Sequence, residues 1–454
     1  MQNNYNETNN YSKRLSRYTN VGKEVGKFTT KFLVNSIISD NKSGKNAAAL
    51  KTALGSLKGP LMKIAQLLST IPGALPPEYT EELSQLQNMA PPMGKGFVRR
   101  RMNTELGLDW ADNFINFEYN PFAAASLGQV HKAITKGEHN VVCKLQYPNM
   151  ISAVEADLKQ LDLIFKINKN LDPAIGTDKI REEIAERLRE ELDYKREASH
   201  LKLFSRILKD HNDINIPDLF ENLSTDKLLV MSFLNGKPLM NYKHSSQEIR
   251  NRIAECLFRA WWVPFGQFGV IHGDPHLGNY SVCEIKNEVS GINLLDFGCV
   301  RRFHPPFVEG VINLYNGLKH NNSELIISSY ELWGFKNLNK DLIETLNIWA
   351  NFIYGPILDN RSRTVADGIK PEMYGRKEAF NVYQLLKKIG PVEIPREFVF
   401  MDRAAIGLGS VFLHLNANLN LHDLFEEAIS GFDADNLLAK QTEIFEKTGV
   451  DYGH

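Results

Sequence analysis

The chain has 454 residues, of which 43% are hydrophobic and 24% charged, with 53 Lys and Arg against 54 Asp and Glu. At about 150 residues per domain, this length predicts roughly three structural units or one large bilobal domain with helical additions. The composition excludes a wholly disordered chain, a collagen and a small disulfide-stapled fold.

The four cysteines contain no Cys-x-x-Cys pair, which argues against a zinc knuckle or a disulfide framework and fits a reducing compartment. The most apolar stretches, Ala260–Ile271 and Ala404–Leu415, are shorter than the roughly 20 residues that span a bilayer, so we expect no integral membrane segment. The N-terminus lacks the apolar core of a secretory signal. Glu7 and the scarcity of arginine there argue against a mitochondrial presequence, although a mitochondrial location stays open.

The N-terminal part of the chain is basic. Residues 1–70 hold 11 Lys and Arg and 3 Asp and Glu, a net charge of +8, so the remainder carries −9. The spacing of apolar residues predicts a basic amphipathic helix over Thr19–Ile38. Residues 13–63 can therefore bind an anionic membrane surface, or pack on the protein body with their lysines in water. Nucleic-acid binding is not expected, because no aromatic surface alternates with the basic residues.

Further along the chain, helical and strand patterns alternate. After a disordered tail at residues 1–12, helices are predicted up to about residue 110. Short apolar runs then predict antiparallel strands at residues 114–119, 129–135 and 140–147, and a charged, helix-forming stretch predicts one long helix over Asp178–Asp210. Further predicted elements are strands at Lys227–Leu234, Val270–Ile271, Tyr280–Ile285 and Ile292–Leu295, a helix at Ser246–Phe268, and mostly helices beyond Pro306.

The most specific segments are HGDPHLGNY, residues 272–280, and LLDFG, residues 294–298. Asp274 and Asn279 are five residues apart, and Asp296 follows an apolar strand and precedes Phe297 and Gly298. Phosphoryl transfer needs a carboxylate that orients the nucleophile and oxygen ligands for Mg²⁺, and kinase-type catalytic loops supply them at this spacing. The two segments therefore predict a kinase-type phosphate site.

These segments also allow two other interpretations. Gly-Asp-Pro, Leu-Gly-Asn and Asp-Phe-Gly can each be an ordinary surface turn. His272 and His276 have the spacing of a zinc-binding helix, but Pro275 and Gly278 would break such a helix.

A lysine that binds nucleotide phosphates is expected upstream on a strand, and VVCKLQYP offers Lys144, although a lone strand lysine often faces solvent. Its carboxylate partner is expected on the long helix, where Asp193 and Glu197 share a face and Glu191 is turned away from Asp193. Between the first two strands, where protein kinases have a glycine-rich loop, the chain has an alanine-rich loop that we expect to be stiffer. The residues of this loop that we expect to bind nucleotide are Ala123, Ala124, Ala125, Ser126 and Gly128.

Together these segments resemble the UbiB/ADCK family of atypical, protein-kinase-like ATPases. The motifs that carry the resemblance lie within about residues 50–305 and are FAAASLGQVH, VVCKLQYP, ELDYKREA, HGDPHLGN and LLDFG. The resemblance implies ATP and Mg²⁺ as cofactors, ATP hydrolysis, little or no phosphorylation of other proteins, and support of ubiquinone or other isoprenoid-lipid metabolism at a membrane. It also implies that Lys144 pairs with Glu197, that Asp274 is the catalytic base, and that Asn279 and Asp296 bind Mg²⁺.

The family has a K-x-G-Q motif, which reads KIAQ here. Lys63 and Gln66 are three residues apart and share a helix face, while Ala65 replaces the family's glycine. By the resemblance, the acids Glu191 and Asp193 meet this lysine and form a lid over the place where a peptide would dock. Without the resemblance, the segment reads as an ordinary amphipathic helix with Lys63 in solvent.

These observations predict an α+β, bilobal protein-kinase-like fold with an N-terminal helical extension and a mostly helical C-terminal lobe. The hinge is expected near Met231–Leu239. The predicted partners are a lipid or isoprenoid-quinone precursor, an anionic membrane and a biosynthetic protein complex, at a cytoplasmic or peripheral membrane location. The predicted domains are a tail (1–12), a helical extension with KIAQ (13–110), a small lobe (111–235) and a large lobe (236–454).

Two other functions compete with the ATPase. The first is a small-molecule kinase of the aminoglycoside or choline type, against which the alanine-rich loop and KIAQ argue. The second is a pseudokinase scaffold that binds nucleotide as a structural ligand. The presence of all four predicted polar residues, Lys144, Asp274, Asn279 and Asp296, argues against a decayed site.

Overall fold

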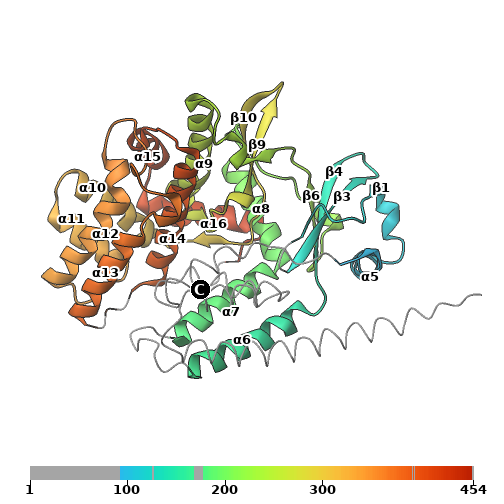
Figure 1. The fold of residues 1–454 in the computed structure, drawn as a ribbon, viewed down its shortest axis with the longest axis horizontal. Coiled ribbons are helices and arrows are strands. Elements are labelled where there is room, and N and C mark those ends of the chain that lie inside the picture. Colours follow the sequence, from blue (N-terminus) through green and yellow to red (C-terminus); the bar gives the residue numbers. More distant parts are fainter. Residues whose placement is uncertain (1–92, 125–126, 168–176, 391, 393, 452–454) are drawn as a thin grey trace, which may run out of the picture. The chain divides into compact units, whose positions relative to one another are not determined.

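The computed structural model describes residues 93–124, 127–167, 177–390, 392 and 394–451 (Figure 1). The tail 1–12, the basic segment 13–63 and the KIAQ motif lie outside these residues. The described residues form two compact units. One contains 93–98, 119–124, 127–130, 145–167 and 177–192, and the other contains 99–118, 131–144, 193–390, 392 and 394–451.

The mixture of strands and helices confirms the predicted α+β class. The α-helices are α5 (Lys95–Leu106), α6 (Met150–Ile167), α7 (Thr177–Glu191), α8 (Tyr194–Ile207), α9 (Gln247–Phe268), α10 (Pro305–Lys319), α11 (Ser323–Leu332), α12 (Lys340–Leu358), α13 (Arg376–Ile389), α14 (Arg396–Leu415), α15 (Leu421–Ile429) and α16 (Ala434–Thr448). The strands are β1 (Phe114–Phe117), β2 (Ala123–Ala124), β3 (Gly128–Thr135), β4 (Asn140–Gln146), β5 (Ile214–Asn215), β6 (Leu228–Ser232), β7 (Lys237–Pro238), β8 (Val270–His272), β9 (Tyr280–Ile285), β10 (Glu288–Leu294) and β11 (Val300–Arg302). Short 3-10 helices are η1 (Trp110–Asn113), η2 (Glu221–Leu223), η3 (Leu239–Tyr242), η4 (Leu277–Asn279) and η5 (Pro371–Met373).

The first sheet has the strand order β1-β3-β4-β6, and β2 pairs with β3. Strand β1 runs antiparallel to β3, with Phe117 opposite Ala133. Along β3 buried and half-buried residues alternate after the first residue, which is the period of a strand with one covered face. The predicted strands at 114–119, 129–135 and 140–147 are thus confirmed.

The second sheet carries the site described below. Its order is β5-β10-β9-β7, and β9 and β10 form an antiparallel hairpin. A separate two-stranded sheet pairs β8 with β11, again antiparallel. Gly291 of β10 lies so close to β5 that a Cβ there would be 2.0 Å from the carbonyl oxygen of Asp213, so only glycine fits.

Helix α9 has the bounds that the sequence predicted and lies beside the second sheet. The Ser246 hydroxyl accepts a hydrogen bond from the N–H of Ile249 at the start. Gly269 ends the helix in the left-handed conformation, with φ of 61°. Because this helix leads directly into β8, its end point fixes where the HGDPHLGNY segment begins.

The predicted single helix over Asp178–Asp210 is wrong, because two helices occupy this stretch. Helix α7 ends at Glu191, and α8 begins at Tyr194. In a continuous helix the N–H of Arg196 would bond to the carbonyl of Leu192, but the Asp193 carboxylate accepts that N–H at 2.9 Å instead. Within the other unit, Gln146 donates to the carbonyl of Leu192 at 2.9 Å. Asp193 is therefore a helix cap and not a member of a helix face shared with Glu197.

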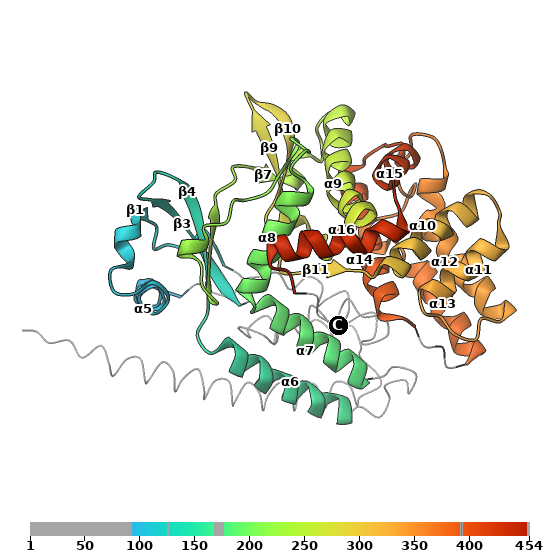
Figure 2. The same ribbon diagram turned by 180° about the vertical axis from the view of Figure 1, so that it is seen from behind.

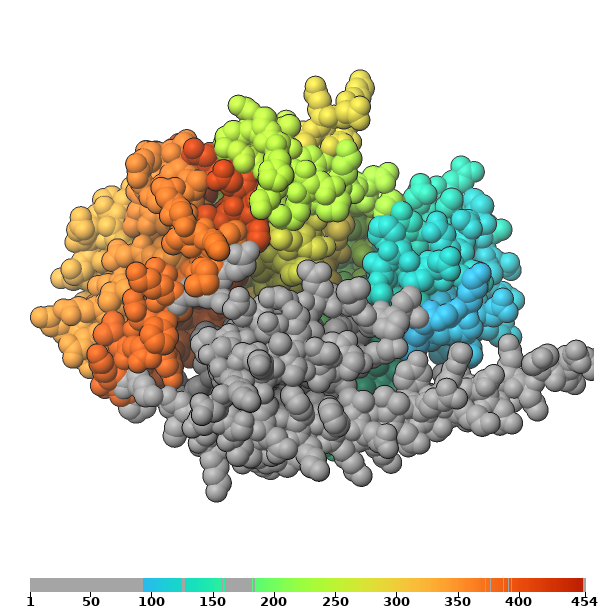
Figure 3. Space-filling view, in the orientation of Figure 1, coloured from blue at the N-terminus to red at the C-terminus, as the bar shows by residue number. Residues whose placement is uncertain are grey.

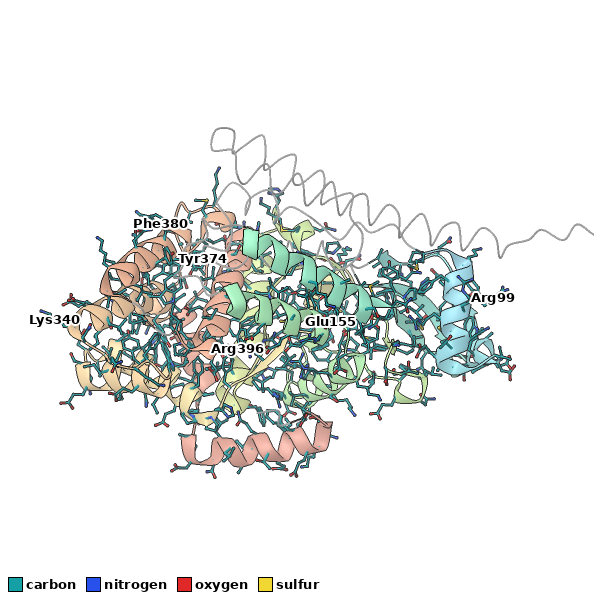
Figure 4. All side chains as sticks on the ribbon, turned by 90° about the horizontal axis from the view of Figure 1, so that it is seen from below. Arg99, Glu155, Lys340, Tyr374, Phe380 and Arg396 are labelled. Atoms are coloured by element: carbon teal, nitrogen blue, oxygen red, sulfur yellow. The ribbon has the colours of Figure 1, made fainter. Side chains whose placement is uncertain are left out.

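Helices α6 and α7 lie side by side (Figure 1). Arg189 of α7 donates two hydrogen bonds to Glu155 of α6, at 3.1 and 2.7 Å, and Figure 4 labels Glu155 on this helix. Both side chains are about half exposed, so the pair adds little stability, and buried apolar residues of the two helices, such as Val154 and Ile184, contribute more.

The C-terminal part of the chain is helical, as predicted, and appears in orange and red in Figure 3. The apolar stretch Ala404–Leu415 is the second half of the 20-residue helix α14. The sequence predicted an apolar stretch too short to cross a membrane, but by length and composition alone α14 is long and apolar enough to do so. Core helices of soluble proteins meet the same criterion. Helix α16 lies against α8 (Figure 2).

A cavity of about 70 Å³ lies among the C-terminal helices. Aromatic residues such as Phe258, Trp262 and Phe412 line it, and Asp402 of α14 is its acidic member. The Asp402 carboxylate accepts a hydrogen bond from the indole N–H of Trp349 at 2.5 Å. Burial raises the pKa of Asp402 well above its usual range, and the Trp349 hydrogen bond opposes this only in part.

We expect Asp402→Asn to raise the stability of the protein at neutral pH. When folding raises the pKa of an acid, the protein loses stability as the pH rises above the acid's unfolded-state pKa of about 3.9 and toward its folded-state pKa. Asparagine keeps an acceptor for Trp349 and has no charge to suppress. Thermal unfolding at pH 7 should therefore give a higher midpoint for the variant, and the gain should disappear near pH 3.5. A lower midpoint at pH 7 would contradict this expectation.

Candidate active site

Asn279 and Asp296 lie at the same end of the β9–β10 hairpin. Tyr280 is paired with Leu294, and the N–H of Leu295 donates to the carbonyl of Asn279 at 3.0 Å. The ladder thus extends one step beyond the strands, and it brings Asn279 next to the residue before Asp296. Two residues that are 17 positions apart in the chain are placed together by backbone pairing.

A second backbone contact joins the two motifs. The N–H of Gly273 donates to the carbonyl of Cys299 at 2.6 Å, and a Cβ on Gly273 would be 2.6 Å from that oxygen. His272 is buried, and its Nε2 hydrogen-bonds to the carbonyl of Asp296. Asp274, which follows Gly273, is therefore held beside the Asp296 segment.

Asp274 and Asn279 are joined by direct hydrogen bonds. The Nδ2 of Asn279 donates to the carbonyl of Asp274 at 3.0 Å and to its carboxylate oxygen Oδ2 at 3.1 Å. Both acceptors lack protons, so the amide nitrogen must face Asp274 and the amide oxygen must point away. The next residue, Pro275, packs on α14, where a Cβ at Gly407 would be 2.2 Å from its ring. The loop that carries Asp274 is thus fixed from both sides.

Lys144 of β4 forms an ion pair with Glu197 of α8. Its Nζ lies 2.7 and 2.8 Å from the two carboxylate oxygens of Glu197, and 3.4 Å from Oδ2 of Asp296. The Glu197 side chain is 2% exposed, whereas that of Asp296 is 43% exposed. One lysine is therefore held between a buried carboxylate and an accessible one.

The electrostatics of Lys144 keep it charged. Burial acts to lower its pKa, but the negative charges of Asp296 and Glu197 act the other way and raise the pKa well above its usual value. The Tyr194 ring also lies under the ammonium, 5.3 Å from Nζ to the ring centroid. Lys144 is a permanent cation at neutral pH, as binding to phosphate oxygens requires.

The donor set of the site fits Mg²⁺. Asn279 presents an amide oxygen and Asp296 an accessible carboxylate, and Mg²⁺ prefers oxygen ligands together with substrate phosphates. Asp296 keeps its orientation because its Oδ1 accepts the N–H of Gly298 at 2.9 Å. Among the described residues, no group of three or more His, Cys, Asp and Glu side chains could hold a metal ion, so a metal here would need phosphate or water oxygens as further ligands.

The zinc interpretation of His272 and His276 is wrong. The Nε2 of His272 is used by the carbonyl of Asp296. His276 is exposed, and its Nδ1 accepts the N–H of Gly278 at 3.1 Å. The segment is a loop with one 3-10 turn, so the two imidazoles do not share a helix face.

Of the alanine-rich loop, Ala123 and Ala124 form β2 and pair with Val130 and Gln129 of β3. Gly128 begins β3 and is buried. These residues belong to the unit that does not contain Lys144, and Ala125 and Ser126 lie outside the described residues. Their contact with a nucleotide stays a prediction.

The lid also stays a prediction, because Lys63 and Gln66 lie outside the described residues. Glu191 is the half-buried last residue of α7, and Asp193 is the exposed cap of α8. The two acids thus lie on either side of a helix break, whereas the sequence predicted that one helix contains both. The signal was present, since Asp is a preferred residue at the start of a helix.

Sequence reasoning missed two residues of α8 that contact the Asp296 segment. Arg196 donates to the carbonyls of Gly298 and Val300, at 3.2 and 3.3 Å. The Nδ1 of His200 bonds to the carbonyl of Phe297 at 3.1 Å. Burial, together with the charge of Arg196, lowers the pKa of His200 to about 3, so the imidazole is neutral. No local pattern reveals partners about 100 residues away in the chain.

Comparison with known proteins shows which family the chain belongs to. The signature of the ABC1 atypical kinase-like domain matches residues 85–330. The chain is 32% identical over 286 residues to "Atypical kinase COQ8, mitochondrial" of Saccharomyces cerevisiae, covering 63% of this chain and 56% of that protein. It is 26% identical over 385 residues to "Atypical kinase COQ8B, mitochondrial" of Rattus norvegicus, covering 84% of this chain and 71% of that protein.

A chloroplast protein and a solved structure are also similar. "Protein ACTIVITY OF BC1 COMPLEX KINASE 8, chloroplastic" of Arabidopsis thaliana is 31% identical over 289 residues, which are 62% of this chain and 37% of that protein. The structure of Rv3197 from Mycobacterium tuberculosis, in complex with erythromycin, has a TM-score of 0.58 and 28% identity, covering 86% of this chain and 96% of that one. These similarities confirm the predicted kinase-like fold and the predicted resemblance. The chain belongs to the family of proteins with an ABC1 atypical kinase-like domain.

Proposed function

We propose that this protein binds ATP with Mg²⁺ and hydrolyses it, in support of ubiquinone or other isoprenoid-lipid metabolism at a membrane. The observation that carries the proposal is the cluster of Lys144, Glu197 and Asp296, joined by backbone contacts to Asp274 and Asn279. Relatives named as atypical kinases in mitochondria support the kinase-like part of the proposal.

Each residue of the cluster has a role that its chemistry allows. Lys144, steadied by Glu197, would bind phosphate oxygens. Asn279 and Asp296 would hold Mg²⁺, which when bound neutralises charge on the phosphates. Asp274 would orient the attacking water and accept its proton, and the Asn279 amide keeps the Asp274 carboxylate in place. By the resemblance, the KIAQ segment would form a lid over the place where a peptide would dock, which would favour ATP hydrolysis over phosphorylation of a peptide.

The experiment that tests the proposal measures ADP and free phosphate together. Purified protein is incubated with ATP and Mg²⁺, with and without liposomes and phenolic quinone-precursor analogues. Equal amounts of ADP and phosphate are expected, and Asp296→Asn should abolish both, whereas Asp210→Asn, which changes an exposed acid in the turn that follows α8, should not. An excess of ADP over phosphate would indicate a small-molecule kinase. Turnover that is absent, or equal in Asp296→Asn, would contradict the proposal.

We also propose that residues 13–63 attach the protein to anionic membranes. The support is the excess of basic residues in this part of the sequence. Co-sedimentation with liposomes should require anionic lipid and should be lost when residues 1–40 are removed. Sedimentation that does not depend on anionic lipid would contradict it.

A further inference from the structure

Helix α8 contacts the segment of residues 296–300 through other residues besides Glu197. Besides Glu197, which holds Lys144, the helix presents Arg196 and His200, which are four positions apart and share a face. Arg196 donates to the carbonyls of Gly298 and Val300, at 3.2 and 3.3 Å, and His200 to that of Phe297, at 3.1 Å. The same helix therefore contacts both the lysine and the backbone beside Asp296.

Side chains hydrogen-bond to most of the backbone carbonyls of residues 296–300. His272, from β8, bonds to the carbonyl of Asp296, so Asp296, Phe297, Gly298 and Val300 each have a side-chain donor. Because carbonyls only accept, the Nδ1 of His200 must carry the proton. His200 is 2% exposed, and no water can replace its bond without opening the core.

The fixed backbone determines where the Asp296 carboxylate points. Its Oδ1 is held by the N–H of Gly298, whose own carbonyl is held by Arg196. A shift of Gly298 would therefore turn the carboxylate and move Oδ2, which lies 3.4 Å from Lys144. A metal ligand that is displaced by 1 Å binds its ion much more weakly, since Mg²⁺ demands near-ideal octahedral geometry.

We propose that Arg196 and His200 are positioning residues, which hold the segment 296–300 so that Asp296 meets the Mg²⁺ of the bound nucleotide. This inference rests on the proposed function. Helix α8 would then fix the positions of both the phosphate-binding lysine and the metal-binding aspartate. The two side chains hydrogen-bond to backbone carbonyls, so we expect their effect to appear in the dependence on Mg²⁺.

The test compares variants that keep or remove each donor. His200→Asn retains an N–H donor close to the position of Nδ1, whereas His200→Leu removes it. Arg196→Met removes both donors of a residue that is only half buried, so folding is less at risk. Arg206→Met is the matched control, because Arg206 lies exposed on the same helix.

The readout is the Mg²⁺ concentration that gives half-maximal ATP turnover, together with nucleotide affinity measured without Mg²⁺. We expect His200→Leu and Arg196→Met to raise that Mg²⁺ concentration at least 10-fold. Nucleotide affinity without metal should stay unchanged, and His200→Asn and Arg206→Met should behave like the wild type. Folding is checked by thermal unfolding, and if His200→Leu does not fold, Arg196→Met decides.

The failures of the two proposals are distinguishable. A wild-type protein whose nucleotide binding and turnover ignore Mg²⁺ would overturn the proposed function, and this inference with it. A wild-type protein that needs Mg²⁺, with folded Arg196→Met and His200→Leu variants of the same Mg²⁺ dependence, would overturn this inference alone. A uniform loss of stability and of metal-free nucleotide affinity would also overturn it, because that is the effect of a merely structural role.

Discussion

Replacing Lys144 by methionine is expected to destabilise the folded protein by about 3–5 kcal/mol, because it leaves the Glu197 carboxylate buried without a counter-charge. Glu197 is 2% exposed and has both oxygens within 2.8 Å of the lysine nitrogen. Asp296 is accessible to water and is affected less. The free energy of unfolding, measured by urea titration, checks this expectation.

Two controls show that the effect belongs to the pair. Lys136→Met makes the same substitution at an exposed position just after β3 and should change stability little. The double variant Lys144→Met, Glu197→Leu should recover most of the lost stability, since apolar residues can replace a buried ion pair. A single variant as stable as the wild type, or a double variant no more stable than the single, would contradict the described pairing.

Replacing Asp274 by asparagine is expected to lower ATP turnover by about 10²- to 10⁴-fold, the usual contribution of a positioned general base. The asparagine oxygen can still accept from Asn279, so the loop should keep its shape. Nucleotide affinity should therefore stay near that of the wild type. Turnover and affinity are measured separately, by phosphate release and by calorimetry.

The matched control is again Asp210→Asn, which removes a carboxylate from an exposed position in the turn that follows α8. A loss of turnover below about 10-fold would show that Asp274 does not act as the base. A parallel loss of affinity would instead show that it binds the nucleotide.

The strands and α9 were predictable because their signals are local. The run at β3 follows the strand period, β4 and β9 are short apolar runs, and Ser246 and Gly269 mark both ends of α9. Strands β5, β7 and β11 were missed because they are only two or three residues long and carry no apolar run. Their pairing is decided by partners distant in the chain.

The site was predictable only in its motif residues. Lys144, Asp274, Asn279 and Asp296 stand in segments whose residue types and spacing are unusual. The break before α8 was missed because the helix-forming composition on both sides hid the cap at Asp193. Arg196 and His200 look like ordinary residues of a charged helix, and only their contacts with residues 297–300 give them a role.

A crystal structure with Mg²⁺ and a non-hydrolysable ATP analogue would test the proposed site most directly. We expect a metal at about 2.0–2.1 Å from the amide oxygen of Asn279 and a carboxylate oxygen of Asp296, with Lys144 on the phosphates. A nucleotide bound elsewhere, or a metal that contacts neither Asn279 nor Asp296, would contradict it.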